Sequence, residues 1–169
     1  MLTPRLCGTI NPTSRGLRQA KEQVIEIPRN DYTVSTNRSR LNLSFVHSYL
    51  SRTSYWAQGR SWDVVRKSIE NSLCFGLYLS QAQIGFARVV TDYATFAWLC
   101  DVFVIEAHQG QGLGKWLIES VVAHPALKSL DIFILATTDA HELYRRYGNF
   151  SELQQPRKWM TRSPEPGHS

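Results

Sequence analysis

The chain has 169 residues, of which 43% are hydrophobic and 20% charged, and this is an ordinary composition for one globular domain with a sizeable core. No apolar run approaches the roughly 18 residues that span a bilayer, so the sequence predicts no membrane protein. The net charge of +5 is concentrated in residues 1–30, which hold five Lys or Arg against two Glu, and the lack of a basic stripe elsewhere argues against a nucleic-acid partner.

Residues 1–30 are rich in Arg, Ser and Thr and have no acidic residue before Glu22. This composition is typical of either an organelle transit peptide or a disordered extension, and we favour the extension. We therefore predict one domain over residues 31–162, followed by a flexible tail at residues 163–169. The three cysteines have no metal-site spacing, which favours a reducing, cytoplasmic setting over an organellar one.

In chain order, polar and β-branched residues alternate over 31–37, which predicts a strand. Residues 39–53 and 61–72 have helical periodicity, and Ser61 is the expected cap of the second helix. Between these helices lies a loop rich in aromatic residues, 54–62. Three strands are then expected, the first two forming a hairpin. They are residues 73–80, 83–92 and 95–105.

A glycine-rich loop separates these strands from the second half of the pattern. A helix is expected over 114–124, stopped by Pro125, and the apolar run 130–138 is expected to be a central strand. A short helix over 139–148 has Asp139 as its expected cap and Gly148 as its stop. Residues 150–162 are expected to supply a last strand.

This order of elements indicates the fold class. An antiparallel series of strands comes first, and a helix then joins two strands that must be parallel. The prediction is a mixed α/β sheet with helices on both faces.

The glycine-rich loop, "QGQGLGK", excludes two nucleotide-binding patterns. A dinucleotide fingerprint would need Gly where Lys115 stands, and a phosphate loop would need Ser or Thr where Trp116 stands. Glycines between a strand and a helix start still offer free N–H groups and a positive helix end to an anion such as pyrophosphate. A tight turn without a ligand is the alternative.

The residues from Gln109 to Gly114 match the (Arg/Gln)-x-x-Gly-x-(Gly/Ala) loop of the GNAT superfamily of acetyl-CoA-dependent N-acetyltransferases. The upstream "CDVFV" resembles that family's preceding strand, and the downstream "DAHELYRRYGNF" resembles its Tyr-containing helix. The resemblance covers roughly residues 31–162, and the expected order of elements also looks like the GNAT fold.

The resemblance implies that acetyl-CoA is the co-substrate and that no metal is needed. The loop would bind the pyrophosphate, and the strand before it would pair with the pantetheine arm in a gap between splayed strands. The implied coenzyme-binding residues are Val102, Phe103, Val104, Gln109, Gly110, Gln111, Gly112, Leu113, Gly114, Lys115, Asp139 and Tyr144.

Acyl transfer to an amine needs an unprotonated amine and a proton for the departing thiolate. Tyr144 falls on the family's Tyr and is the expected acid, with an aromatic packing role as the alternative. Asp101, a carboxylate within an apolar strand, is either the base or a structural hydrogen-bond anchor, and alternation places it on the face of Leu99 and Phe103. His141, Glu106 and water are weaker candidates for the base.

The acceptor would be a small-molecule amine. Tyr55 and Trp56 in the aromatic loop offer stacking surfaces, and Arg60 together with Arg88 would suit an acceptor that bears a carboxylate. Ordinary surface arginines are the alternative. The sequence departs from the family's pattern at Glu106, Gln109, Asp139 and Asn149.

These features predict N-acetyl transfer by direct reaction in a ternary complex, since no cysteine occupies a motif position. The alternative is a non-catalytic acyl-CoA-binding module of the same fold. The resemblance also implies a homodimer, paired through the sheet edge or the last strand, as a candidate assembly.

Overall fold

The computed structural model describes residues 24–162; the predicted N-terminal extension up to residue 23 and the tail at 163–169 lie outside these residues. The helical elements are α2 (Leu43–Ser48), the π-helical turn η2 (Tyr49–Thr53), α3 (Trp62–Glu70), α4 (Leu113–Val122) and α5 (His141–Gly148). The strands are β1 (Glu26–Arg29), β2 (Tyr32–Ser35), β3 (Leu73–Leu79), β4 (Ala82–Thr91), β5 (Phe96–Val104) and β6 (Ile132–Leu135). Short 3-10 turns also occur, of which η3 (Glu106–His108) and η5 (Pro156–Lys158) bear on the site.

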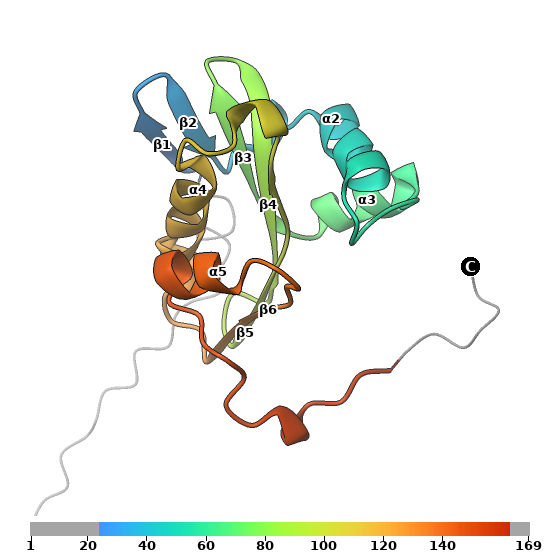
Figure 1. Cartoon of the computed structure of the whole chain (residues 1–169), viewed down its shortest axis with the longest axis vertical. Coiled ribbons are helices and arrows are strands. Elements are labelled where there is room, and N and C mark those ends of the chain that lie inside the picture. Colours follow the sequence, from blue (N-terminus) through green and yellow to red (C-terminus); the bar gives the residue numbers. More distant parts are fainter. Residues whose placement is uncertain (1–23, 163–169) are drawn as a thin grey trace, which may run out of the picture.

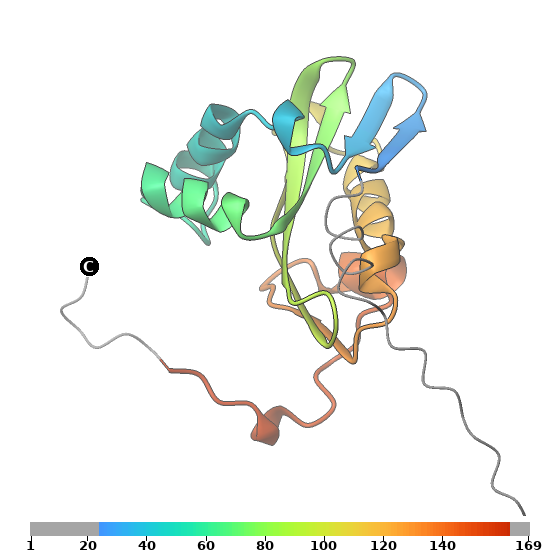
Figure 2. The ribbon, with the colours of Figure 1, turned by 180° about the vertical axis from the view of Figure 1, so that it is seen from behind.

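The six strands form one sheet in sequence order from β1 to β6. All neighbours are antiparallel except β5 and β6, which are parallel and are joined through α4. Helices α2 and α3 cover one face of the sheet, and α4 and α5 cover the other (Figure 1 and, from behind, Figure 2). This confirms the predicted mixed α/β architecture.

Each face of the sheet has its own core. On the α4 side, Leu99, Leu117 and Val121 belong to one buried cluster. On the α2–α3 side, Val46, Val65 and Phe103 belong to a second. Alternation along the strands sends side chains to the two clusters in turn, which is why one sheet serves two helical layers.

Local signals set several element boundaries as expected. The Ser61 hydroxyl accepts a hydrogen bond from the Val64 N–H and caps α3. Helix α4 ends at Val122, before the predicted stop at Pro125. The predicted hairpin is formed by β3 and β4.

Three expectations were wrong. The ordered fold begins before residue 31, because β1 pairs with β2 and extends the sheet. Strand β6 is not central but lies at the end of the sheet order, and Ile132 is 41% exposed. Residues 151–162 contain no strand, only η5, where Pro156 has no N–H to donate to a neighbouring strand.

The expected cap of α5 was also wrong. Ala140, not Asp139, occupies the N-cap, and its N–H donates to the Thr137 hydroxyl. The helix stops as predicted near Gly148, but Asn149 adopts the left-handed conformation that ends it, at φ 56°.

A β-bulge interrupts β5 at Asp101. Arg88 pairs with Cys100 and Phe86 with Phe103, so two residues of β5 oppose one of β4. Asp101 has a left-handed backbone, at φ 53°. The bulge shifts the alternation, so Leu99 and Phe103 pack in different cores and the predicted shared face for Leu99, Asp101 and Phe103 is wrong.

Candidate active site

The strands β5 and β6 separate at the end where the predicted gap should lie. Their parallel pairing runs from Phe96 and Ile132 to Leu99 and Leu135 and stops there. Strand β5 continues to Val104, whereas β6 ends at Leu135. The last five residues of β5 therefore have a main-chain edge that β6 does not cover, which is the edge an extended ligand could pair with.

The main-chain N–H and C=O groups of the uncovered part of β5 point alternately toward β4 and away from it. The Ile105 N–H donates to Ile84 O in the line of β4, so alternation turns the main-chain groups of Val102 and Val104 away from β4. The Val104 carbonyl accepts a hydrogen bond of 2.8 Å from the Gln109 side-chain amide. Gln109, expected to contribute to a phosphate site, thus ties the glycine loop to the strand before it.

The glycine loop connects β5 to α4 through η3. Gly110 and Gly112 have φ values of 76° and 75°, which L-residues with side chains rarely adopt, and a Cβ on either would meet no atom within 4 Å. Gly112 is the N-cap of α4 and supplies no side-chain cap, so the first N–H groups of the helix have no partner within it. An open surface of free N–H groups at a helix start is suited to an anion.

Side chains around this loop point in several directions. Leu113 is buried in the core, and the Lys115 ammonium lies over the Tyr147 ring, 5.0 Å from its centroid. The Gln111 side chain accepts a hydrogen bond from the Tyr32 hydroxyl on β2. The backbone N–H groups of the loop are therefore its main candidates for contact with an anionic ligand.

Tyr144 lies on α5, beside the gap between β5 and β6. Burial, and to a smaller extent the nearby Tyr55, Asp139 and Cys100 groups, raise its pKa to about 12. Its ring meets Phe150 edge-on at 6.1 Å. A phenol with this pKa keeps its proton throughout the neutral range and can act as a hydrogen-bond donor or acid.

Asp101 is held by both predicted acceptor-binding arginines. Its two carboxylate oxygens accept from Arg60 Nη1 at 3.1 and 3.2 Å, and Oδ2 also accepts from Arg88 Nε at 2.7 Å. The Asp101 side chain is only 2% exposed. The structure therefore brings Asp101, Arg60 and Arg88 together, in a cluster that the sequence treated as separate base and substrate residues.

The 54–61 loop reaches across to the loop between β6 and α5. The Tyr55 hydroxyl lies 2.6 Å from Thr138 Oγ1 and donates to Asp139 at 3.3 Å. Trp56 meets Tyr55 edge-on at 5.1 Å, and the two residues are 39% and 59% exposed. Tyr55 thus links two segments 83 residues apart on either side of the gap, a contact for which the sequence carries no signal.

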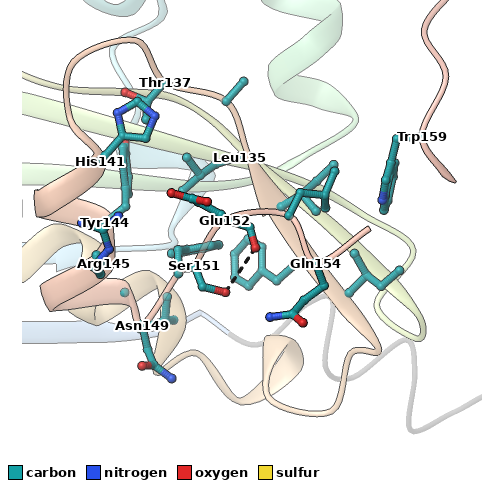
Figure 3. Close-up of a pocket in the computed structure, with 18 of the residues that line it drawn as sticks. Leu135, Thr137, His141, Tyr144, Arg145, Asn149, Ser151, Glu152, Gln154 and Trp159 are labelled. Atoms are coloured by element: carbon teal, nitrogen blue, oxygen red, sulfur yellow. Dashed lines mark hydrogen bonds between the residues drawn. The ribbon is translucent and has the colours of Figure 1, made fainter. Parts of the chain in front are cut away.

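The weaker base candidates lie further out. His141 and Glu106 are exposed. Burial, together with the smaller effect of the Glu106 charge, raises the pKa of Tyr49, which stacks on Phe103 at 3.7 Å. His141 and Tyr144 line one side of an open hollow of about 910 Å³ beside β6 and the segment after α5 (Figure 3). This hollow borders the Tyr144 side of the site rather than the glycine loop.

The described residues contain neither a metal-binding cluster nor a membrane-spanning helix. Residues 24–162 contain no group of three or more His, Cys, Asp or Glu side chains that could hold a metal ion. Within those residues, no helix is long and apolar enough to cross a membrane.

Comparison with known proteins identifies this arrangement. Residues 70–148 match the model of the acetyltransferase (GNAT) domain. A Gibberella zeae protein named as an acetyltransferase is 32% identical to the chain over 143 residues, which cover 69% of this chain and 77% of the relative.

Solved structures agree. A Xanthomonas campestris pv. campestris protein of the GNAT family is 44% identical, with a TM-score of 0.76, and the match covers 82% of this chain and 95% of that one. A GNAT acetyltransferase of Elizabethkingia anophelis, solved with acetyl-CoA bound, shares the fold at 15% identity and a TM-score of 0.54, over 70% of this chain and 76% of that one. The chain therefore belongs to the GNAT superfamily and is an acetyl-transferring enzyme.

Proposed function

We propose that this enzyme moves the acetyl group of acetyl-CoA to the primary amine of a small molecule that also carries a carboxylate. The observation that carries the proposal is the gap beside β5, which has the proton-holding Tyr144 on one side and the Arg60 guanidinium on the other. Transfer is direct, with both substrates bound at once.

The chain's own groups fit coenzyme A. The N–H groups around Gly110 and Gly112 and the start of α4 suit a pyrophosphate, and no Cβ obstructs the approach at either glycine. The uncovered edge of β5 offers the main chain of Val102 and the Val104 N–H to an amide-containing arm. The Val104 carbonyl is already used by Gln109.

Acetyl-CoA supplies a thioester, whose sulfur departs as a thiolate that needs a proton. Tyr144 lies beside the gap and keeps its proton at neutral pH, since the pKa of a phenol is ordinarily near 10 and burial raises that of Tyr144 to about 12. We assign it the transfer of that proton to the sulfur. The proton that the attacking amine loses passes to solvent, and Tyr144 regains one proton from solvent, which completes the cycle.

A covalent cysteine intermediate is disfavoured by the described cysteines. Burial raises the pKa of Cys74 to about 12 and that of Cys100 to about 11, so both thiols stay protonated at neutral pH. The thiolate is the nucleophilic form of cysteine, and these two residues would supply almost none of it. Direct attack by the amine remains the simpler route.

The acceptor side favours a carboxylate. Arg60 uses one nitrogen, Nη1, for Asp101, and its side chain is 26% exposed beside the exposed rings of Tyr55 and Trp56. The Nε and Nη2 groups can therefore donate to a planar anion in the manner that arginine prefers. The adjoining rings offer stacking surfaces to the rest of the molecule.

Thiol release from acetyl-CoA tests the proposal. The panel consists of L-phenylalanine, L-glutamate and L-lysine, the amines formed by removing the carboxyl group of each, and spermidine as a polyamine. We expect release with at least one amino acid and at least tenfold less with its decarboxylated partner, about the 1.4 kcal/mol of a single charge-assisted contact. Faster release with the decarboxylated amines or spermidine would refute the carboxylate, and acetyl-CoA binding without release on any amine would favour a non-catalytic module.

A further inference from the structure

We propose that Asp101 is a positioning residue and not the base: it fixes Arg60, and through it the 54–61 loop, to the bulge of β5. The inference deepens the proposed function, since the loop that it positions is the one assigned to the acceptor. It follows from three observations, namely the accessibility of the carboxylate, its partners and the hydrogen bonds of the loop.

The carboxylate is poorly placed to take a proton from an amine. Its side chain is 2% exposed, and both oxygens already accept hydrogen bonds from guanidinium groups. A base must reach the proton that it removes, directly or through one water. In this structure arginine nitrogens occupy the approach to Asp101.

The charge of the cluster points the same way. One carboxylate and two guanidiniums sum to a net positive charge, which attracts an anionic group and repels an ammonium. Arg88 is further fixed by a hydrogen bond from Nη1 to the Ser72 hydroxyl and is itself largely buried. Arg60 is the more exposed of the two, so the surplus charge is presented on the side of the loop.

Besides the burial of Ala57 in the core on the α2–α3 side, hydrogen bonds hold the loop. The Gly59 N–H donates to Ser51 O and the Arg60 N–H to Ala57 O, and both of these bonds lie within the segment from η2 to Arg60. The hydrogen bonds from Arg60 to Asp101 tie this segment to the sheet. Tyr55 supplies a second tie at the other end of the loop, to Thr138 and Asp139.

The bulge explains why an aspartate stands there. A residue with a side chain pays about 1 kcal/mol or more to adopt a left-handed backbone, and aspartate is among those that tolerate it best. The bulge turns the side chain of residue 101 toward Arg60 and Arg88, away from the core that contains Leu99. The backbone irregularity and the ion pairs therefore act together to place Arg60.

Three variants test this role: Asp101→Asn, Arg60→Ala and the double substitution. Asparagine keeps the size of the side chain and one acceptor oxygen but removes the charge. With the best amine of the panel, we expect the KM for the amine to rise about tenfold in Asp101→Asn, the Kd for acetyl-CoA to stay within about twofold, and the pH profile of kcat to keep its shape. Because Asp101 acts through Arg60, the double variant should match Arg60→Ala rather than add to it.

A base would behave differently. Loss of kcat by about 100-fold or more in Asp101→Asn, with little change in the KM for the amine and with loss of the acidic limb of the kcat profile, would overturn the proposal. Additive effects in the double variant would do the same. Asp63→Asn, on α3 with an 84% exposed side chain, is the matched control and should behave as wild type.

Hydrogen exchange separates this inference from the proposed function. If no amine of the panel is acetylated, the acceptor proposal fails, but the positioning role is still measured by amide exchange in the 54–61 loop. We expect faster amide exchange at residues 59 and 60 in Asp101→Asn and in Arg60→Ala, equal acceleration in the double variant, and unchanged exchange in Asp63→Asn. Wild-type exchange in Asp101→Asn would overturn the positioning role whatever the acceptor.

Discussion

Replacing Tyr144 with phenylalanine removes the hydroxyl and leaves the ring. The ring contact with Phe150 is kept, so folding and coenzyme binding should change little. Since burial raises the pKa of Tyr144 to about 12, roughly one hydroxyl in 10,000 is ionised at about pH 8, and the wild-type acid is almost fully protonated. General acid catalysis contributes about 100- to 10,000-fold.

The lower end of that range applies here. A thiol has a pKa near 8.5, so a thiolate can depart unprotonated more readily than an alkoxide or an amide. We therefore expect Tyr144→Phe to lower kcat about 100-fold, or about 2.7 kcal/mol in the barrier, with the Kd for acetyl-CoA within about twofold. Because the acid stays protonated, wild-type kcat should also show no alkaline fall below about pH 10 from this group.

The assay is thiol release at saturating acetyl-CoA, with coenzyme affinity measured by calorimetry. Tyr147→Phe, on the same helix, is the control, because its ring faces Lys115 and its hydroxyl has no proposed role. Wild-type turnover in Tyr144→Phe would remove the residue from the mechanism. Equal losses in both variants would indicate damage to α5 rather than loss of an acid.

Three further predictions concern backbone conformation and pH. Gly112→Ala should lower the free energy of unfolding by about 1 kcal/mol, because φ is 75° there, and it should weaken acetyl-CoA binding. Gly59→Ala is the control: φ is 76°, so the loss of stability should be similar, but the affinity for the coenzyme should not change. Burial lowers the pKa of His124, so unfolding binds a proton and stability should fall as pH drops below about 6.5. His124→Asn, which can still accept from the Ala126 N–H, should flatten that dependence in denaturant titrations. Asn149→Gly should raise the free energy of unfolding by up to about 1 kcal/mol, and the melting temperature with it, because Asn149 has φ 56° and glycine adopts this angle more easily.

Each of these has a contrary result. Unchanged coenzyme affinity in Gly112→Ala would place the pyrophosphate elsewhere. A pH dependence of stability that survives in His124→Asn would assign it to another group. A lower melting temperature in Asn149→Gly would mean that the asparagine side chain, rather than its backbone conformation, stabilises the end of α5.

Local chemistry was readable from the sequence. Alternation, helical period and the Ser61 cap predicted the order of elements from β2 to α5, because each depends on residues within one or two turns. The glycines at 110 and 112 were recognisable as a special loop since glycine readily takes their backbone angles. Tyr144 was found through its place in a helix motif, not through its surroundings.

The roles of the remaining residues depend on contacts across the chain. Strand β1 and the edge position of β6 follow from pairing, which a single segment does not specify. The alternation argument for Asp101 failed because the bulge adds one residue to β5, and a bulge is visible only against the partner strand.

The sequence by itself determined the family, the order of elements from β2 to α5 and the loop that suits coenzyme A, because these reside in short motifs. Tertiary structure alone decided that Asp101 is enclosed by Arg60 and Arg88, which lie 41 and 13 residues away in the chain. A buried carboxylate takes its function from the charges that surround it, and here those charges are the basis of our proposal that Asp101 is an anchor rather than a base.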